Sequence, residues 1–194
     1  MPHRPARPAP PREVRIIGGL WKRTKLPVAD KPGLRPTLDR VRETLFNWLG
    51  QDLDGWHCLD AFAGTGALGF EAASRGAAAV WMLEADAQLV HQLKTTRDRL
   101  QGEALHIENT DALRWMRASA PARFDLVLLD PPFSAGLFEA ALRAATPLLR
   151  PGGWLYLESD APPQPSWLSE LGLSVWRESR AGAVHFCLLQ PSAP

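Results

Sequence analysis

From residue 57 onward, short apolar runs alternate with longer amphipathic stretches. Strands buried on both faces are continuous apolar runs, whereas crossover helices show an apolar period of about 3.6 residues. The runs that fit strands are 57–61, 79–84, 104–107, 124–130 and 153–158. The stretches that fit helices are 66–75, 86–100, 110–118 and 136–149, the last of which should end at the sequence RPGG. This alternation predicts an α/β fold with a mostly parallel sheet and helices on both faces.

Further elements flank this region on both sides. After it, a short helix near 166–171 precedes two strand-like runs, LSVWRES and AVHFCLL, which are joined by a turn with glycine. These runs predict a hairpin, so the sheet should finish with an antiparallel element. Before residue 57, VRII predicts a short strand and GGLWKRTKL a loop or hairpin. The apolar stripe that follows Thr37 predicts a helix over 37–49, with Thr37 as its N-cap.

Length and composition fit one globular domain. The chain has 194 residues, of which 45% are hydrophobic and 22% charged. It has no apolar run near the roughly 18 residues of a membrane span, and its first residues lack the apolar core of a secretory signal, so a cytoplasmic location is expected. Cys58 and Cys187 suit core positions, and the spacing of the cysteines and histidines indicates no metal site.

Charge is distributed unevenly along the chain. Residues 1–50 hold 11 Lys and Arg against 4 Asp and Glu, whereas the other 144 residues hold 11 against 17. A basic front end on an acidic body indicates contact with a polyanion, and nucleic acid is the commonest such partner.

A glycine-rich loop follows the first predicted strand of the parallel sheet. In CLDAFAGTGALG, Gly64, Gly66 and Gly69 stand between a strand and a helix, as in loops that bind NAD or S-adenosylmethionine. Glu84, about 20 residues further on, is placed to accept hydrogen bonds from ribose hydroxyls. Asp60 precedes the glycines, where a carboxylate would repel a pyrophosphate but suit a sulfonium ion. Charge therefore favours S-adenosylmethionine, and bound nicotinamide would instead indicate a dehydrogenase.

Two further acidic positions follow the later strands. Asp111 either accepts from an adenine amine or only caps the next helix. Asp130, in the tetrad DPPF, either belongs to a simple turn or faces the same crevice as the glycine loop. An exocyclic amine is a poor nucleophile, so an enzyme must orient its lone pair. Asp130 and the carbonyl of Pro131 can accept its two N–H groups, Pro132 stiffens the loop, and Phe133 can stack on the target base.

The combined motifs resemble a known group. DAFAGTGALG, LEAD, TDAL and DPPF look like the class I S-adenosylmethionine-dependent methyltransferases that act on exocyclic amines. The segment from RIIGGLWKRTK to RETLFNWL narrows the resemblance, over about residues 14–190, to the bacterial family that makes N2-methylguanine in 16S ribosomal RNA, the RsmD family. This implies a Rossmann-like sheet of seven strands with the last one antiparallel. It also implies a guanine target on an assembling small ribosomal subunit.

The resulting predictions assign parts of the chain to roles. Residues 1–12, with five prolines, should be a disordered tail, residues 13–50 a basic extension that contacts RNA, and residues 51–191 the methyltransferase domain. The expected catalytic residues are Asp130, Pro131, Pro132 and Phe133. The expected cofactor-binding residues are Asp60, Phe62, Gly64, Thr65, Gly66, Glu84, Ala85, Asp111 and Ala112. The expected RNA-binding residues are Arg15, Trp21, Lys22, Arg23, Lys25, Arg35, Arg40 and Arg42. Of these, Arg35, Arg40 and Arg42 are expected near RNA or the cofactor pocket.

The partner is expected to be 16S ribosomal RNA, with no metal and no membrane, and the protein is expected to be a monomer. Three alternatives remain open. The first is an adenine-N6 methyltransferase acting on RNA or DNA, which would use the same tetrad. The second is the dehydrogenase, and the third is an RNA-binding scaffold without catalysis, which would not bind S-adenosylmethionine.

Overall fold

A computed structural model describes residues 13–31, 37–133 and 136–192, and it contains a sheet of seven strands. The strands, in their spatial order β5-β4-β3-β6-β7-β9-β8, are β5 (Leu105–Asn109), β4 (Ala79–Glu84), β3 (His57–Asp60), β6 (Phe124–Leu129), β7 (Leu149–Ser159), β9 (Val184–Pro191) and β8 (Leu173–Ala181). Neighbours from β5 to β7 are parallel, and β9 runs antiparallel to both β7 and β8. The predicted α/β architecture with a reversed last strand is confirmed.

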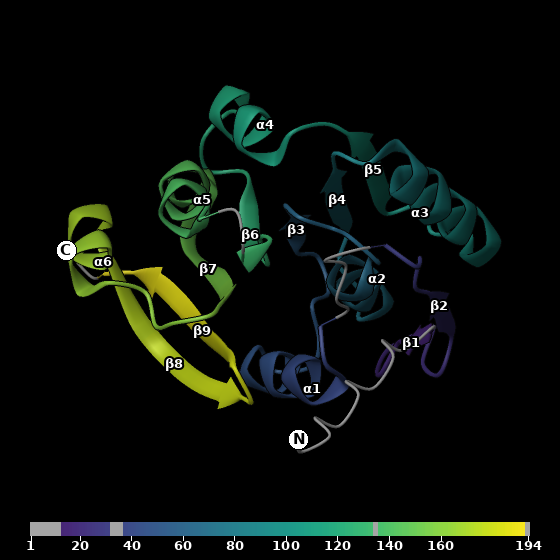
Figure 1. The fold of residues 1–194 in the computed structure, drawn as a ribbon. Coiled ribbons are helices and arrows are strands. Elements are labelled where there is room, and N and C mark those ends of the chain that lie inside the picture. Colours follow the sequence, from purple (N-terminus) through teal and green to yellow (C-terminus); the bar gives the residue numbers. More distant parts are fainter. Residues whose placement is uncertain (1–12, 32–36, 134–135, 193–194) are drawn as a thin grey trace, which may run out of the picture.

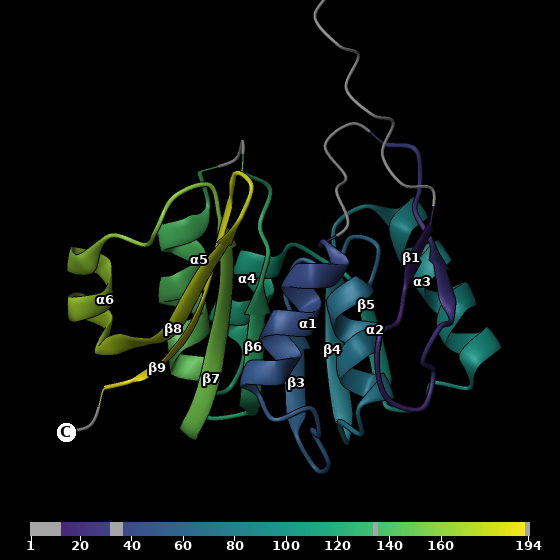
Figure 2. The ribbon, with the colours of Figure 1, turned by 90° about the horizontal axis from the view of Figure 1, so that it is seen from below.

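Helices cover both faces of this sheet, as Figures 1 and 2 show. On one face lie α1 (Asp39–Trp48), α2 (Ala67–Ser74) and α3 (Ala87–Leu100), and on the other lie α4 (Ala112–Ala118), α5 (Phe138–Ala145) and α6 (Pro165–Leu171). The central strands alternate between two core clusters. In β6, for example, Leu126 and Leu128 pack on the α1 side, whereas Val127 and Leu129 pack on the α5 side.

One helix ends earlier than the apolar pattern predicts. The pattern predicted a helix over 136–149, but α5 stops at Ala145 and a 3-10 turn covers Thr146–Leu148. Pro147 has no N–H to donate and its ring crowds the preceding turn, so the α-helical hydrogen bonds cannot continue through it. The sequence RPGG then lies inside β7 instead of ending a helix.

The N-terminal extension packs into the same core as the sheet. Its strands β1 (Glu13–Arg15) and β2 (Lys25–Pro27) form an antiparallel hairpin that lies near α3 (Figure 1), where Arg99 donates to the carbonyl oxygen of Lys25 at 3.0 Å. Val14 and Leu26 from the hairpin belong to the cluster that also contains Phe46 from α1. The predicted disordered tail, residues 1–12, lies outside the described residues.

A buried ion-pair network fastens this extension to α2. Glu71, which is fully buried, accepts backbone N–H groups of Ile17 at 2.8 Å and Gly18 at 2.7 Å. It also pairs with Arg42 of α1 at 3.2 Å and with Arg75 at 2.8 Å. One carboxylate therefore ties the hairpin, α1 and α2 together.

None of the helices in the described part of the chain combines the length and the apolar character needed to cross a membrane.

Replacing Glu71 should destabilise the protein strongly. Glu71→Gln keeps the side-chain shape but leaves two guanidinium groups without a buried counter-charge, which typically costs about 3–5 kcal/mol in free energy of unfolding. Urea unfolding measures the loss, and the exposed Glu43→Gln is the matched control, expected to change stability by less than about 0.5 kcal/mol. Equal stability of Glu71→Gln and wild type would show that the network contributes nothing net.

Candidate active site

Four acidic residues gather at the carboxyl ends of the central strands. Asp60 ends β3, Glu84 ends β4, Asp130 follows β6 directly, and Glu158 is the penultimate residue of β7. Each acid stands two residues after a strand residue that packs on the α1 side. Because side chains alternate along a strand, all four acids belong to that face of the sheet. Because β3 pairs with β4 and β6, and β6 with β7, the four strand ends are neighbours. Open α/β sheets bind their ligands at this edge.

The glycine loop lies between β3 and α2 in a backbone conformation that requires glycine. Gly66 has a φ of 81°, and a Cβ there would lie 2.6 Å from Phe70 and 2.7 Å from Leu93. The Gly64 N–H donates to Glu84 Oε2 at 2.9 Å. This hydrogen bond holds the glycine loop against the end of β4.

Glu84 and Asp60 are both held by backbone donors. The second Glu84 oxygen accepts the N–H of Asp86 at 2.8 Å, and Asp60 Oδ2 accepts the N–H of Gly69 at 2.9 Å. Asp60 is only 1% exposed. Burial raises its pKa to about 7, with further increases from the charges of Asp130 and Glu84, while the Gly69 N–H opposes the shift.

The remaining cofactor-binding candidates surround these two acids or follow the next strand. Asp111 is the N-cap of α4, where its Oδ1 accepts the N–H of Arg114 at 2.7 Å, so the capping role is confirmed. Its contact with adenine stays a prediction. Phe62 is half-buried, Thr65 and Ala112 are buried, and Ala85 is exposed.

Asp130 is held by a residue that the sequence assigned to another role. The Thr37 hydroxyl donates to Asp130 Oδ2 at 3.1 Å. Helix α1 instead has Leu38 at its N-cap position with no side-chain cap, so the predicted N-cap role of Thr37 is wrong. Burial raises the pKa of Asp130 to about 6, and the hydrogen bond from Thr37 opposes that shift. The Thr37 hydroxyl therefore stabilises the charge of Asp130 instead of capping α1.

The other three residues of the DPPF tetrad follow Asp130 at the carboxyl end of β6. Pro131 is buried, Pro132 is exposed and Phe133 is half-buried, with its ring 5.8 Å from that of Phe138 at the start of α5. One side of the Phe133 ring is thus supported by α5. Residues 134 and 135 lie outside the described residues.

Sequence reasoning missed Glu158 and Tyr156. Glu158 is 4% exposed and accepts a hydrogen bond from the hydroxyl of the fully buried Tyr156 at 2.8 Å. The strand over 153–158 was predicted, and its alternation would place both side chains on one face together with Trp154. An acidic residue inside an otherwise apolar strand was the available signal.

The basic candidates of the extension differ in accessibility. The exposed ones are Arg15, Lys22, Arg23, Lys25 and Arg40, of which Lys25 pairs with Glu13 at 2.7 Å. Trp21 is half-buried with its ring 6.4 Å from Phe70, and Arg35 lies outside the described residues.

The structure contradicts the predicted RNA-binding role of Arg42. Its side chain is fully buried, and it donates to Glu71, to Asp39 at 2.6 Å and to the carbonyl oxygen of Arg15 at 2.8 Å. A guanidinium group without exposed surface cannot contact RNA, so that prediction is wrong. Its position three residues before Leu45 and four before Phe46, which share one face of the helix, was the signal for burial.

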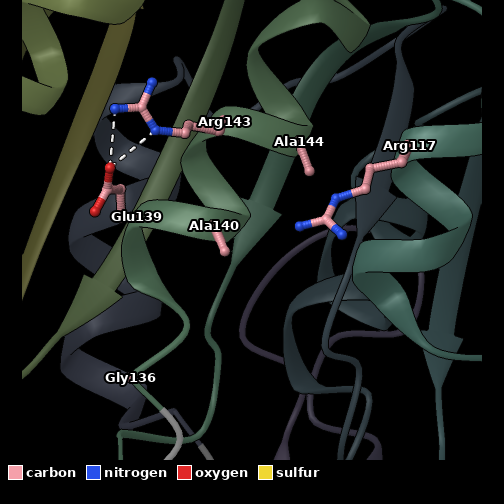
Figure 3. A pocket seen from close by; sticks show the side chains of 6 residues that line it. All are labelled: Arg117, Gly136, Glu139, Ala140, Arg143 and Ala144. Carbon is pink, nitrogen blue, oxygen red and sulfur yellow. Dashed lines mark hydrogen bonds and ion pairs between the residues drawn. The ribbon is translucent and has the colours of Figure 1, made fainter.

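A hollow lies on the opposite face of the sheet, between α4 and α5. Figure 3 shows its lining, which consists of Arg117, Gly136, Glu139, Ala140, Arg143 and Ala144. Arg143 there pairs with Glu139 at 2.9 Å. It is distinct from the acidic edge because α4 and α5 pack on the other core cluster. Within the described residues, no group of three His, Cys, Asp or Glu side chains could hold a metal ion.

A Rossmann-like sheet with a reversed last strand, a glycine loop after its central strand and a DPPF tetrad at the next strand end define a class I methyltransferase. A family profile described as Conserved hypothetical protein 95 matches residues 14–190. The chain belongs to this family, the RsmD family of methyltransferases.

Named relatives support the same assignment. The chain is 42% identical to ribosomal RNA small subunit methyltransferase D of Escherichia coli K12, covering 93% of this chain and 91% of the relative. It is 40% identical to the protein of that name from Haemophilus influenzae, covering 92% and 94%. Among solved structures, a putative methyltransferase of Escherichia coli matches with a TM-score of 0.80 and 37% identity, covering 94% of this chain and 99% of that one.

Asp60 should make stability depend on pH. Its folded pKa, about 7, lies above its ordinary value of 3.8, so its contribution is fully present below pH 4 and is lost as pH rises through 7. Asp60→Asn, which can still accept from Gly69, should therefore be more stable than wild type at pH 8 by on the order of 4 kcal/mol, with no advantage at pH 4. Urea unfolding at both pH values measures this, and the exposed Glu103→Gln should show no such difference.

Proposed function

We propose that the protein transfers a methyl group from S-adenosylmethionine to the exocyclic N2 of a guanine in 16S ribosomal RNA. The observation that carries the proposal is Asp130 at the end of β6, beside the strand that leads into the glycine loop and oriented by Thr37. The names of the relatives, which specify ribosomal RNA of the small subunit, support the substrate class. The guanine N2 position rests on the motif resemblance.

The chemistry of the acidic edge fits S-adenosylmethionine better than a nucleotide with a pyrophosphate. Asp60, Glu84 and Asp130 are close enough for the charges of the other two to raise the pKa of Asp60. A cationic ligand would relieve this repulsion, whereas a pyrophosphate would increase it. Glu84 would accept from the ribose hydroxyls, Asp111 from the adenine amine, and the glycine loop would contact the methionine part. When bound, S-adenosylmethionine supplies an electrophilic methyl group on a positively charged sulfur.

The target amine is oriented by the strand end. Asp130 accepts one N–H of the amine and the Pro131 carbonyl oxygen accepts the other, so that the nitrogen lone pair is directed away from the protein acceptors and toward the methyl group. No base needs to deprotonate the neutral amine first. After transfer the nitrogen is cationic, and its proton leaves to water or to Asp130, whose pKa of about 6 suits a transient acceptor.

Phe133 binds the flipped base. Its ring is half-buried and lies 5.8 Å from that of Phe138, and the exposed part of the ring would stack on the base. Such stacking contributes roughly 1–3 kcal/mol per base, which offsets the few kcal/mol required to unstack the base from RNA. Pro132 limits the conformations of the loop that presents this ring.

The exposed basic residues of the extension contact the RNA backbone. Lys22 and Arg23 lie in the turn between β1 and β2, and Arg40 lies in the first turn of α1. Phosphate contacts position an RNA but do not read its sequence. The enzyme would therefore select its target nucleotide through the folded shape of the RNA substrate. An assembling small subunit, bound by a monomer of this protein, is the proposed substrate form.

Asp130→Asn should abolish most of the methyl transfer without weakening cofactor binding. Small-subunit particles from cells that lack the gene are incubated with each variant and S-adenosylmethionine, and methylated nucleosides are mapped by mass spectrometry. The expected wild-type product is N2-methylguanosine at one position. Loss of the ionised acceptor should reduce turnover roughly 10²–10³-fold, while calorimetry should find the cofactor affinity changed less than about twofold.

Asp160→Asn is the matched control because Asp160 is exposed at the same end of the sheet, and it should retain normal turnover. Three results would contradict the proposal. These are N6-methyladenosine as the product, unchanged turnover in Asp130→Asn, or no binding of S-adenosylmethionine by the wild type.

Removing Lys22 and Arg23 should reduce the salt dependence of RNA binding. Each phosphate contact that is lost lowers the slope of log affinity against log salt by about 0.7–0.9, so the double change to Gln should lower it by about 1.5. Filter binding between 50 and 200 mM salt measures the slope. Arg177 and Arg180 of β8 are exposed as well, and their change to Gln removes the same charge. An equal effect from this control pair would contradict a specific role for the extension.

A further inference from the structure

Helix α4 carries two arginines that the mechanism above does not use. Arg114 and Arg117 are both exposed and stand three residues apart, so they lie on the same side of the helix. The N-cap Asp111 accepts the backbone N–H of Arg114 at 2.7 Å. Within the described part of the chain, neither guanidinium group forms an ion pair, and α4 itself contains no acidic residue. The helix therefore presents two positive charges that the protein leaves without a partner.

Helix stability explains only one of these two charges. Arg117 lies in the last turn of α4, where a cation interacts favourably with the helix dipole. Arg114 is the third residue of the helix, in the first turn, where a cation is unfavourable for the same reason. A ligand of negative charge on this side of α4 would account for both residues.

The Arg117 side chain lies in the hollow between α4 and α5, two helices that pack side by side (Figure 1). In Figure 3 it points from α4 toward Ala140 and Ala144 of α5. The short side chains of these two alanines leave the space open, and the hollow has a volume of about 520 Å³. Pockets of about 300–1,000 Å³ hold small molecules, so a phosphate together with its sugar can be accommodated here.

The other charged residues of the hollow are already paired. Arg143 pairs with Glu139 at 2.9 Å and also with Glu170. Its guanidinium group turns away from Arg117 in Figure 3. An anion in the hollow would thus be bound by Arg117, and Glu139 would be its unfavourable neighbour.

The hollow begins close to the tetrad that is proposed to hold the target base. Gly136 lines one end of it and comes three residues after Phe133 in the chain. The Phe133 ring lies 5.8 Å from that of Phe138, the first residue of α5. From Phe138 to Ala144 the helix rises about 9 Å, at 1.5 Å per residue. This length corresponds to two or three nucleotides of a strand at about 3.4 Å each.

We propose that the hollow between α4 and α5 holds the RNA strand next to the target nucleotide, with Arg117 and Arg114 bound to its backbone phosphates. The inference rests on the proposed function and adds a second RNA surface, on the sheet face opposite the extension. The RNA would then be held from both sides of the carboxyl edge, by Lys22 and Arg23 on one face and by α4 on the other. Phosphate contacts fix the register of a strand, so these arginines would position the base at the tetrad.

The double variant Arg114→Gln with Arg117→Gln tests the charge of this surface. Two lost phosphate contacts should lower the slope of log affinity against log salt by about 1.5. If binding at 1 M salt is unchanged, this slope makes binding to small-subunit particles roughly 30-fold weaker at 0.1 M salt. The loss of methylation should appear mainly in KM. An unchanged slope, or an equal effect from the β8 pair Arg177→Gln with Arg180→Gln, would overturn the inference.

Glu139→Gln should have the opposite effect. It removes the negative charge from the hollow, while Arg143 keeps its second partner, Glu170. Binding to the particles should become up to about fivefold tighter, which is the size of one exposed charge interaction. Glu178→Gln on β8 makes the same change of charge elsewhere on the surface and should leave affinity unchanged. Weaker binding by Glu139→Gln would contradict a phosphate in the hollow. Thermal unfolding checks that each variant is folded.

Cross-linking from Ala140→Cys identifies what occupies the hollow. The two native cysteines, Cys58 and Cys187, are buried, so a thiol-reactive photo-cross-linker should attach at the new position alone. The cross-linked nucleotide, mapped by primer extension on the particle, should lie within about three nucleotides of the methylated guanine. Ser174→Cys, exposed on β8, is the control and should not cross-link there. A cross-link to a ribosomal protein, or to distant RNA, would overturn the inference.

The outcomes separate the inference from the proposed function. If wild type methylates the particle and the α4 double variant binds it as wild type does, only the inference fails. If wild type binds and Ala140→Cys cross-links to RNA but no methyl group is transferred, the proposed function fails and the RNA contact stands. Absence of any binding between wild type and the particle would overturn both.

Discussion

The crowding of acidic side chains at the carboxyl ends of β3, β4, β6 and β7 is the constraint on which the site depends. Strand alternation brings these side chains to one face, where burial and mutual repulsion make it costly to ionise all of them. The fold responds by giving each a donor. Asp60 and Glu84 receive backbone N–H groups, whereas Asp130 and Glu158 receive hydroxyl groups.

The N-terminal extension is part of this edge. Thr37 reaches Asp130 from 93 residues earlier in the chain, and its position depends on α1, which is fixed by Leu45 and Phe46 in the core. The buried pair of Arg42 and Glu71 then joins α1 to the hairpin. Under the proposed function, the segment that contacts RNA also orients the catalytic carboxylate.

The apolar pattern predicted almost every strand and helix because period and strand length are local properties. It failed at the end of α5, where Pro147 interrupts an apolar stretch, and at residues whose role depends on partners far away in the sequence. Thr37 had the sequence context of an N-cap, and only the proximity of Asp130 in the fold gave its hydroxyl a stronger acceptor. Arg42 stood in a basic cluster, and its burial depends on Glu71, whose partners are far apart in the sequence. Glu158 was overlooked because its importance arises from pairing between β6 and β7.

The two carboxyl groups at the ends of β6 and β7 differ in their surroundings, because Glu158 is buried and Asp130 is only half-buried. Under the proposed function, a positive charge beside Asp130 before methyl transfer favours its ionised form, which is the form that accepts the amine. Transfer moves that charge from sulfur to the target nitrogen, directly against Asp130, and the proton then leaves from there. Burial and the charge of Asp130 raise the pKa of Glu158 well above its ordinary value, so Glu158 competes less for negative charge at this edge than a freely ionised carboxylate would.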